Sequence, residues 1–549
     1  MNYRGVNREA DPGNQAIDNA LGLAMPLPGI DLSYLATRQW RILAFRSASM
    51  TAIKRTFHLR DSFDSRAVSE QYGGDEPPLR SELFSAEQME KHGKILAGLH
   101  QLISGSAPDQ LLVRLAENES VILHACNLLT DAVSANRRIT PAGEWLLDNF
   151  YLIEEQIATA RRHLPRGYSR QLPRLANGDS AGFPRVYDLA LATISHGDGR
   201  VDPENLSRFV SSYQTVSALK LGELWAIPIM LRLALIENLR RVGVRIAAHM
   251  IERDLADNWA DQMMEVAASD PKNLILVIAD MARSNPPMVS SFVSELARRL
   301  QGQSSALAVG LTWIEQQLSE SSQTIEQMVQ TETQLQATDQ VSISNSIGSL
   351  RFLGAMDWRN FVEDQSVVEQ ILLEDPRNIY GQMDFGTRDN YRHVIEKIAR
   401  KSDLSEGEIA RKAIDLAKNG SQTMGSDDRS AHAGFYLIAE GLPALERASV
   451  SSHSITDGLQ KIGAKFPLFF YLGSIFAITC LLSFEFLAII RIDHLSGQAL
   501  LFVGMVFLVC TSKFAVSLVN WLATMFLASK SLPKMDFSAG IPKKHVRLS

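Results

Sequence analysis

Two long apolar runs near the C-terminal end constrain the fold more than any other feature of this sequence. The first runs from Phe466 to Ile490 and the second from Ala499 to Ser529. Each exceeds the roughly 20 residues that a helix needs to cross a bilayer. Because only residues 491–498 separate them, we expect a tight two-helix transmembrane hairpin over residues 466–529.

Lysine and arginine residues around these runs indicate which side of the membrane the ends occupy. The connecting loop carries one residue of this kind, Arg491, whereas both outer flanks are basic. Basic flanks are retained on the cytoplasmic side, so we expect both ends to be cytoplasmic and the short loop to be extracytoplasmic. The flanking residues are Lys461, Lys465, Lys530, Lys534, Lys543, Lys544 and Arg547.

Two ionisable residues, Glu485 and Lys513, fall inside the apolar runs. A charge in the bilayer core costs at least a few kcal/mol unless it is paired or faces protein. At about 1.5 Å per helical residue, Glu485 lies less than ~10 Å from the loop and Lys513 about 20 Å from it, so the two do not pair. We expect Lys513 to face other helices or a polar passage. The alternative is a shifted span in which its amine reaches the interface.

From Pro78 to about Ala448 the sequence repeats the start signals of α-helices. Apolar residues recur at spacings of three and four, and strand-like alternation between hairpin turns is nearly absent. We therefore expect an all-α fold, with a multi-helix cytoplasmic part ahead of the hairpin. The expected helix-start residues are Ser85, Thr140, Asp202 and Ser405, and the helix after Ser405 is expected to close at Gly420.

Within this region we expect a first helical lobe over residues 78–300 and a second over residues 301–448. The second lobe would contain one long coiled-coil-like helix from Leu311 to Leu335, because its apolar residues keep helical spacing and no proline interrupts it. Residues 1–77 hold scattered basic residues and turn signals, and we interpret them as a poorly ordered extension. A basic, surface-seeking helix over residues 38–57 is the alternative.

Composition argues against several classes of function. The 549-residue chain has a net charge of −6 and no basic stripe with interleaved aromatics, so no nucleic-acid partner is expected. Its three cysteines are too few for a disulfide framework and fit a reducing compartment. The sequence has no glycine-rich phosphate loop, zinc-ligand spacing or Asp-x-Asp pair, so we expect no catalytic residue, metal site or cofactor in this chain.

The stretch LGELWAIPIMLRLALIENLRR, Leu221 to Arg241, places polar residues along an apolar helix. Charges every few residues exclude a membrane span. One interpretation is a buried helix whose charged residues pair with neighbouring helices. The other is a cleft that receives a sugar chain or a partner domain. The candidate contact residues are Glu223, Trp225, Arg232 and Glu237, joined by Asp384 and Arg388 from the stretch MDFGTRDNYRHVIEKIAR.

Five stretches carry a resemblance to a known family. They are EWLLDNFYLIEEQI, LPRGYSRQLPRLANG, GFPRVYDLALATISHGDGRVD, LGELWAIPIMLRLALIENLRR and YGQMDFGTRDNYRHVIEKIAR. In this order they resemble the N-terminal region of bacterial cyclic β-1,2-glucan synthases. The resemblance runs from about Pro78 through the hairpin to LPKMDFSAGIP and leaves the first 75 residues uncovered.

The resemblance implies a protein of the bacterial inner membrane, with a periplasmic loop between the two spans. Family members are very large enzymes in which an inverting glucosyltransferase domain follows the helical region and the hairpin. That domain uses UDP-glucose and a divalent metal, and a phosphorylase-like region comes later. In this chain, residues 530–549 would be the cytoplasmic start of the transferase domain, and no catalytic residue of the family falls on a position here.

Two hypotheses about function follow. In the first, the chain is the membrane-anchored N-terminal part of a cyclic β-1,2-glucan synthase, present as a split or truncated reading frame. It would act as scaffold and membrane anchor without a catalytic centre. Its partners would be the lipid bilayer and either the remaining synthase domains or a separately encoded glycosyltransferase. In the second, it is a free-standing, non-enzymatic helical membrane protein that binds a partner protein or glucan.

Overall fold

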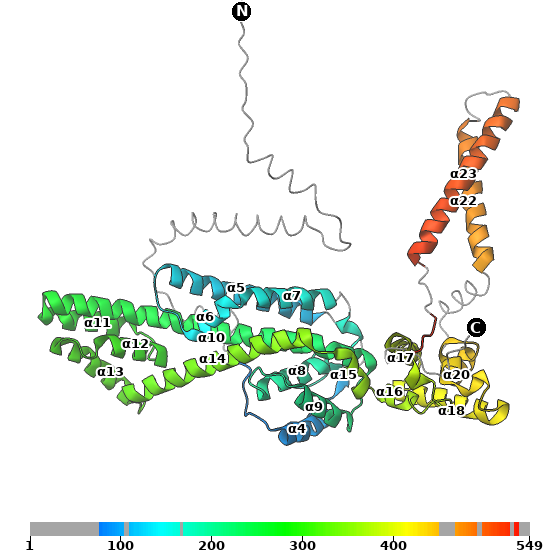
Figure 1. The fold of residues 1–549 in the computed structure, drawn as a ribbon. Helices are drawn as coiled ribbons and strands as arrows, with labels where there is room; N and C mark the ends of the chain where they lie inside the picture. The colour runs from blue at the N-terminus through cyan, green and yellow to red at the C-terminus, as the bar shows by residue number, and fades with distance from the viewer. Residues whose placement is uncertain are drawn as a thin grey trace, which may run out of the picture. The chain divides into compact units, whose positions relative to one another are not determined.

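The computed structural model describes residues 76–103, 109–164, 168–449, 467–490, 497–526 and 532–536. The chain divides into two compact units, Met1–Ala67 and Val68–Ser549, and every described residue belongs to the second. Nearly all regular structure in the described ranges is helical, so the expected all-α class is confirmed (Figure 1). Two short strands, β1 (Leu102–Ile103) and β2 (Arg174–Leu175), form an antiparallel pair. The extension expected over residues 1–77 lies almost entirely outside the described residues.

Helix α10 (Leu221–Ser269) is the longest described helix, with 49 residues, and it organises two hydrophobic cores. Most of its residues are buried from Leu221 to Gly243, on every face, because other helices surround this half. This first cluster of buried side chains, the α10 core, also contains residues of helices placed far along the chain. Those helices are α4 (Ala86–Leu99), α5 (Gln110–Ser134), α6 (Pro141–Asp148), α7 (Phe150–His163), α8 (Arg185–His196), α9 (Pro203–Gln214), α14 (Ile325–Ala355) and α15 (Trp358–Gln365).

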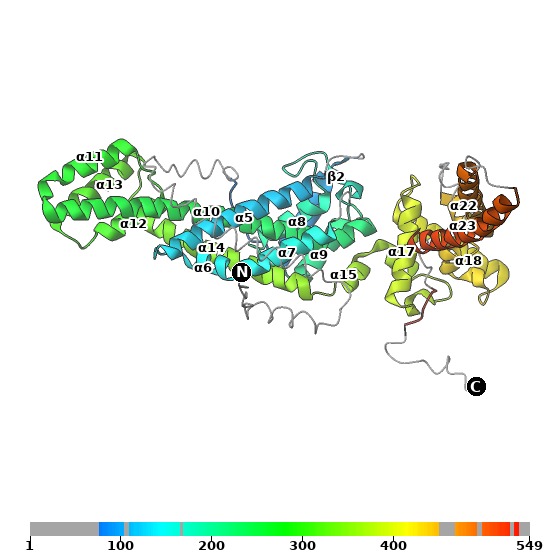
Figure 2. The same ribbon diagram turned by 90° about the horizontal axis from the view of Figure 1, so that it is seen from above.

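The C-terminal half of α10 belongs to a second cluster, the α12 core, which includes Ala256, Ala260 and Met263. Figure 2 shows the helices of this core gathered around that end of α10. Helix α12 buries one face, including Phe292 and Leu296, against it. The partners are α11 (Leu274–Ser284), α12 (Ser290–Leu300), α13 (Ala308–Glu320) and the beginning of α14.

The expectation of one helix from Leu311 to Leu335 is wrong, because the chain turns between α13 and α14. Ser322 has a φ of 56°, in the left-handed region that an α-helix does not use. Thr324 then begins α14 with a capping box, in which its hydroxyl accepts from the Gln327 N–H. The sequence T-x-x-Q carries this start signal, but the apolar spacing continues past it, with misses at Ser321 and Glu332, and suggested one helix.

A third cluster, the α18 core, lies in the helices that precede the hairpin. Its largest buried side chains include Tyr380 and Tyr391. Since α14 contributes to both the α10 core and the α12 core, the clusters do not coincide with lobes over 78–300 and 301–448, and that division stays a prediction. The helices of the α18 core are α16 (Val367–Leu372), α17 (Phe385–Ala399), α18 (Glu406–Met424), α19 (Ala433–Ile438) and α20 (Leu442–Ser449).

Helix α18 runs past Gly420, where the sequence had predicted its end. It continues to Met424, and the glycine with positive φ is Gly425, at 95°. Gly420 is instead a point of close approach, because a Cβ atom there would collide with the backbone carbonyl of Ser430. A glycine can mark either feature, and only the packing tells them apart.

Helices α22 (Pro467–Ile490) and α23 (Gly497–Phe526) pack against each other (Figure 1). Both are long and apolar enough to cross a membrane, with mean hydropathies of 1.8 and 2.0 over their spans. Two polar contacts join them. The Tyr471 hydroxyl donates to Asn520 Oδ1 at 2.8 Å, and the hydroxyls of Ser483 and Thr511 lie 3.1 Å apart.

The two ionisable residues of the hairpin, Glu485 and Lys513, are both exposed on its surface. Lys513 therefore does not point into the contact between α22 and α23. Whether it faces other helices or a polar passage in the membrane stays a prediction.

Candidate functional site at the start of helix α10

Glu223 lies in the first turn of α10 and is fully buried. Its two carboxylate oxygens each accept a hydrogen bond of 2.7 Å from the Arg185 guanidinium, from Nε and from Nη2. The Lys220 N–H also donates to it, at 2.9 Å. Because Arg185 is the first residue of α8, this bidentate pair holds the start of α8 against the start of α10.

Glu237, four turns further along α10, is the centre of a larger buried network and is 1% exposed. Arg114 on α5 donates to both of its oxygens, at 3.0 and 2.7 Å, and Asn118 donates at 2.8 Å. Arg240 and Arg241 donate as well, at 2.9 and 2.8 Å. Burial alone would raise the pKa of Glu237, but the hydrogen bonds and charges of these arginines outweigh it and lower the pKa to about 2.

Arg232 is also buried, and its side chain contacts two other helices of the α10 core. Its Nε donates to Gln156 Oε1 at 2.9 Å, and its Nη2 lies 3.4 Å from the Leu353 carbonyl. Burial lowers the pKa of this guanidinium. The charged residues of α10 thus bind neighbouring helices, as one of the two interpretations of the sequence predicts, and their contact with a partner or glucan stays a prediction.

Trp225 differs from these residues because it is only partly buried and faces the α18 core. Its ring lies edge-on to Phe385, with 6.3 Å between centroids and an interplanar angle of 84°. The guanidinium carbons of Arg359 and Arg392 lie 5.3 and 5.2 Å from the centre of the Phe385 ring. The Trp225 Nε1 atom is buried and has no hydrogen-bond partner among the described residues.

Trp225 and Glu223 line a cavity of about 600 Å³. Arg232, which the sequence grouped with them, lies outside it. The walls come from residues 168–173, from the start of α10, and from the end of α17 through the start of α18. Cleft-shaped sites of this size commonly hold small ligands. The polar and aromatic lining residues are Tyr168, Gln171, Lys220, Glu223, Trp225, His393, Glu396, Arg400, Ser402, Asp403, Ser405 and Glu406.

Glu406 is not one of the candidate residues from the sequence. Among the carboxyl groups of the lining that have no arginine partner, it is the least exposed to solvent. It is 9% exposed, and its Oε2 accepts from the Leu221 N–H at 2.8 Å. Burial raises the pKa of Glu406 to about 7; the Leu221 hydrogen bond opposes this and the nearby charge of Glu396 adds to it. Glu406 therefore connects the first residue of α18 to the first residue of α10.

Asp384 and Arg388, the two candidates from α17, have structural contacts. Asp384 is the N-cap of α17 and accepts from the Thr387 N–H at 3.1 Å. Arg388 pairs with Glu363 and Glu369, each at 2.9 Å. The fully buried Arg392, one turn further on, binds the same two carboxylates. These residues lie beside the cavity wall but not in it.

Residues 532–536, the exit segment, follow α23 and bind to the start of α17. Met535 forms an antiparallel bridge with Met383 and packs on the α18 core. The Asp384 N–H donates to the Lys534 carbonyl at 3.0 Å, and the Asp536 N–H donates to the Gln382 carbonyl at 2.9 Å. The chain that leaves the hairpin is therefore held by the same α17 stretch that supplies Phe385.

The Lys534 N–H makes a further contact in this segment, to Thr387 Oγ1, at 2.9 Å. These contacts join residues about 150 apart in the chain. No local sequence pattern predicts such a pairing, although the tripeptide Met-Asp-Phe occurs both at residues 383–385 and at residues 535–537.

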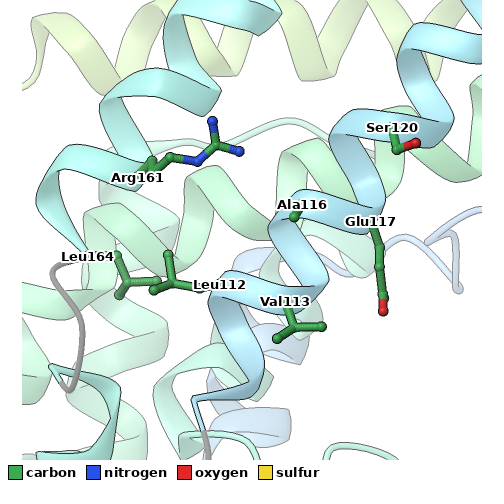
Figure 3. A pocket seen from close by; sticks show the side chains of 7 residues that line it. All are labelled: Leu112, Val113, Ala116, Glu117, Ser120, Arg161 and Leu164. Atoms are coloured by element: carbon green, nitrogen blue, oxygen red, sulfur yellow. The ribbon is translucent and has the colours of Figure 1, made fainter.

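A second, more open hollow of about 810 Å³ lies between α5 and α7 (Figure 3). Its lining is mostly apolar, with Leu112, Val113 and Leu164. One of its two charged residues, Arg161, binds Glu119 at 2.5 Å. No buried polar group converges on it, so the cavity at the start of α10 is the better candidate site. Neither hollow holds a metal-binding set, since no group of three His, Cys, Asp or Glu suited to a metal occurs among the described residues.

Comparison with known proteins gives the chain a relative. No family model matches it. A curated protein, cyclic β-(1,2)-glucan synthase NdvB of Rhizobium meliloti, is 30% identical over 468 residues. The match covers 85% of this chain and 16% of that protein's length. Over most of its length, this chain is therefore related to one part of a cyclic β-(1,2)-glucan synthase.

Proposed function

We propose that this chain is a membrane-anchored helical scaffold in the synthesis of cyclic β-(1,2)-glucan. It positions a glucosyltransferase against the membrane and has no catalytic centre of its own. The relationship to the Rhizobium meliloti synthase supports a role in glucan synthesis. The buried, internally paired charges of α10 support a structural role for this helix.

The docking of the exit segment is the observation that carries the scaffold proposal. The α17 stretch precedes the hairpin and the exit segment follows it, yet three backbone N–H groups join the two. This contact supports the proposal that both ends of the hairpin lie on one side of the bilayer. Basic flanks favour the cytoplasm for that side, and we therefore propose that the short loop of the inner-membrane hairpin is periplasmic.

The partners that follow from this proposal are the lipid bilayer and a glycosyltransferase. The transferase is either the remainder of a synthase or a separately encoded chain, and it supplies the sites for UDP-glucose and a divalent metal. The exit segment then fixes the point at which the polypeptide leaves the membrane, because backbone hydrogen bonds hold it on the α18 core.

The test is a two-polypeptide reconstitution. This chain and the unmatched remainder of the Rhizobium meliloti synthase are expressed separately and together in cells that make no cyclic glucan, and glucose incorporation from UDP-glucose is measured in their membranes. We expect glucan only when both are present, and less of it with Thr387→Val, which removes the acceptor of the Lys534 N–H. Thr423→Val, at an exposed threonine that bonds only within α18, is the matched control.

Glucose transfer by this chain alone would refute the scaffold proposal. So would full glucan production by the other polypeptide without it.

A further inference from the structure

We propose that the cavity at the start of α10 is a binding site for a neutral, hydroxyl-rich chain, a short segment of β-(1,2)-glucan. This inference rests on the proposed function only for the identity of the sugar. The class of ligand follows from the charges, the aromatic rings and the unused hydrogen-bonding capacity of the cavity lining.

The charge of the lining does not favour anionic ligands. Four carboxylates face two cationic side chains, with one histidine beside them. Glu223 is paired with Arg185, Glu396 is paired with Arg400, and burial raises the pKa of Glu406 to about 7. The lining therefore has no excess of positive charge to bind a phosphate or a nucleotide sugar. Sugar hydroxyls, in contrast, donate hydrogen bonds to carboxylates without adding charge. The carboxylates are Glu223, Glu396, Asp403 and Glu406, and the cations are Lys220 and Arg400.

Glu406 is the group that points to a ligand rather than to packing alone. Its carboxyl group is nine-tenths buried, yet it forms no ion pair with any described residue. The Leu221 N–H occupies Oε2, and Oε1 accepts no hydrogen bond within the described chain. Oε1 is not among the fully buried side-chain atoms that lack a partner, so it is accessible to a donor that enters the cavity.

Trp225 and Tyr168 supply the aromatic surface that a pyranose ring needs. The Trp225 ring is held edge-on by Phe385, and the Tyr168 hydroxyl donates to the Gly222 carbonyl at 3.2 Å. Both rings are therefore fixed before a ligand arrives, which reduces the entropy lost on binding. Aromatic faces bury the apolar C–H faces of a sugar, while carboxylates of the lining accept hydrogen bonds from its hydroxyls.

The volume fits a chain rather than a single sugar. The cavity of about 600 Å³ is in the middle of the roughly 300–1,000 Å³ range of ligand pockets. The cavity is partly open to solvent, so a longer glucan can extend out of it.

The experiment is equilibrium dialysis of the full chain, in lipid nanodiscs, against a radiolabelled linear β-1,2-linked glucose tetrasaccharide. UDP-glucose and the α-1,4-linked tetrasaccharide serve as ligand controls. The variants are Trp225→Phe, which keeps a ring against Phe385, and Glu406→Gln, whose amide oxygen still accepts from the Leu221 N–H. The matched controls are Trp145→Phe and Glu315→Gln, at exposed residues outside the cavity lining.

We expect the β-1,2 tetrasaccharide to bind the intact chain, and each cavity variant to weaken its affinity by about tenfold. Hydrogen exchange should slow in residues 393–406 when the saccharide is present, while the two control variants bind as the intact chain does. Circular dichroism and thermal unfolding of each variant establish that the fold is retained.

Three results would overturn the inference. The first is no saccharide binding, or equal binding by cavity and control variants. The second is preferential binding of UDP-glucose at the cavity. The third is protection of residues 393–406 by the remaining synthase polypeptide alone, which would make the cavity a contact for a partner domain. None of these results decides the scaffold proposal, because the two-polypeptide reconstitution measures that separately.

Discussion

Replacing Glu237 by glutamine should destabilise the α10 core strongly. The substitution keeps the shape of the side chain but leaves Arg114, Arg240 and Arg241 around a neutral group that is 1% exposed. Removing one partner of a buried ion pair costs about 3–5 kcal/mol. The pKa gives a similar figure: a fall from 4.5 to about 2 corresponds to about 3 kcal/mol of stability at neutral pH.

The same pKa fixes how this contribution depends on pH. Because folding lowers the pKa of Glu237, its stabilisation is complete above pH 4.5 and is lost as the pH falls towards 2. The difference between the intact chain and the variant should shrink from about 3 kcal/mol at pH 7 to about 1.5 kcal/mol at pH 3.

Native-state hydrogen exchange of the full chain measures this, because it reports the opening free energy of α5 and α10 separately from the membrane hairpin. The matched control is Glu117→Gln. Glu117 also faces Arg114, at 3.7 Å, but is 57% exposed, so its loss should cost less than about 1 kcal/mol. Equal opening free energies for the two variants, or a difference that does not shrink at pH 3, would refute the reasoning.

Three further predictions test the other contacts. The double variant Met383→Cys, Met535→Cys should form a disulfide on mild oxidation, because a non-hydrogen-bonded antiparallel pair has Cα atoms about 4.5 Å apart. Mass spectrometry should detect this bond, and should detect none in the control double variant Met383→Cys, Leu532→Cys. Burial raises the pKa of Glu406 to about 7 in the fold, so Glu406 contributes stability below pH 4.5 that is lost as the pH rises to about 7. This loss amounts to about 3 kcal/mol, and thermal unfolding measured against pH should not show it in the Glu406→Gln variant. Gly199→Ala should destabilise by about 1–3 kcal/mol more than Gly178→Ala in denaturant unfolding, because both have a φ of 78° but only at Gly199 would a Cβ meet Ser346.

The charged residues of α10 explain why a stretch this apolar is not a membrane span. Glu223 and Glu237 each bind arginines from other helices, Arg185 on α8 and Arg114 on α5. Such pairs contribute little net stability over apolar residues of the same size, but an incorrect packing would leave one partner buried and unpaired. We infer that they select one arrangement of helices around α10, which is the requirement of a scaffold.

The local features of this protein follow from short-range signals in its sequence. The starts at Ser85, Thr140, Asp202 and Ser405 are confirmed, because an N-cap is decided by a side chain and an N–H three residues away. The two apolar helices of the hairpin are likewise set by composition alone. The sequence did not predict the break at Ser322, because the apolar spacing on either side of it favours a single helix. The capping residues Thr324 and Gln327 carry the signal for a new helix start.

Which of these features contact one another depends on the tertiary structure. Glu223, Trp225 and Arg232 were candidate contact residues from one stretch of the sequence, yet the fold places Trp225 at a cavity and turns Arg232 towards Gln156. Glu406 comes to Leu221 from 185 residues away, and Thr387 binds a segment beyond the hairpin. Helix periodicity specifies the direction of a side chain on its own helix, but the partner depends on how whole helices pack, and that information is spread over the entire chain.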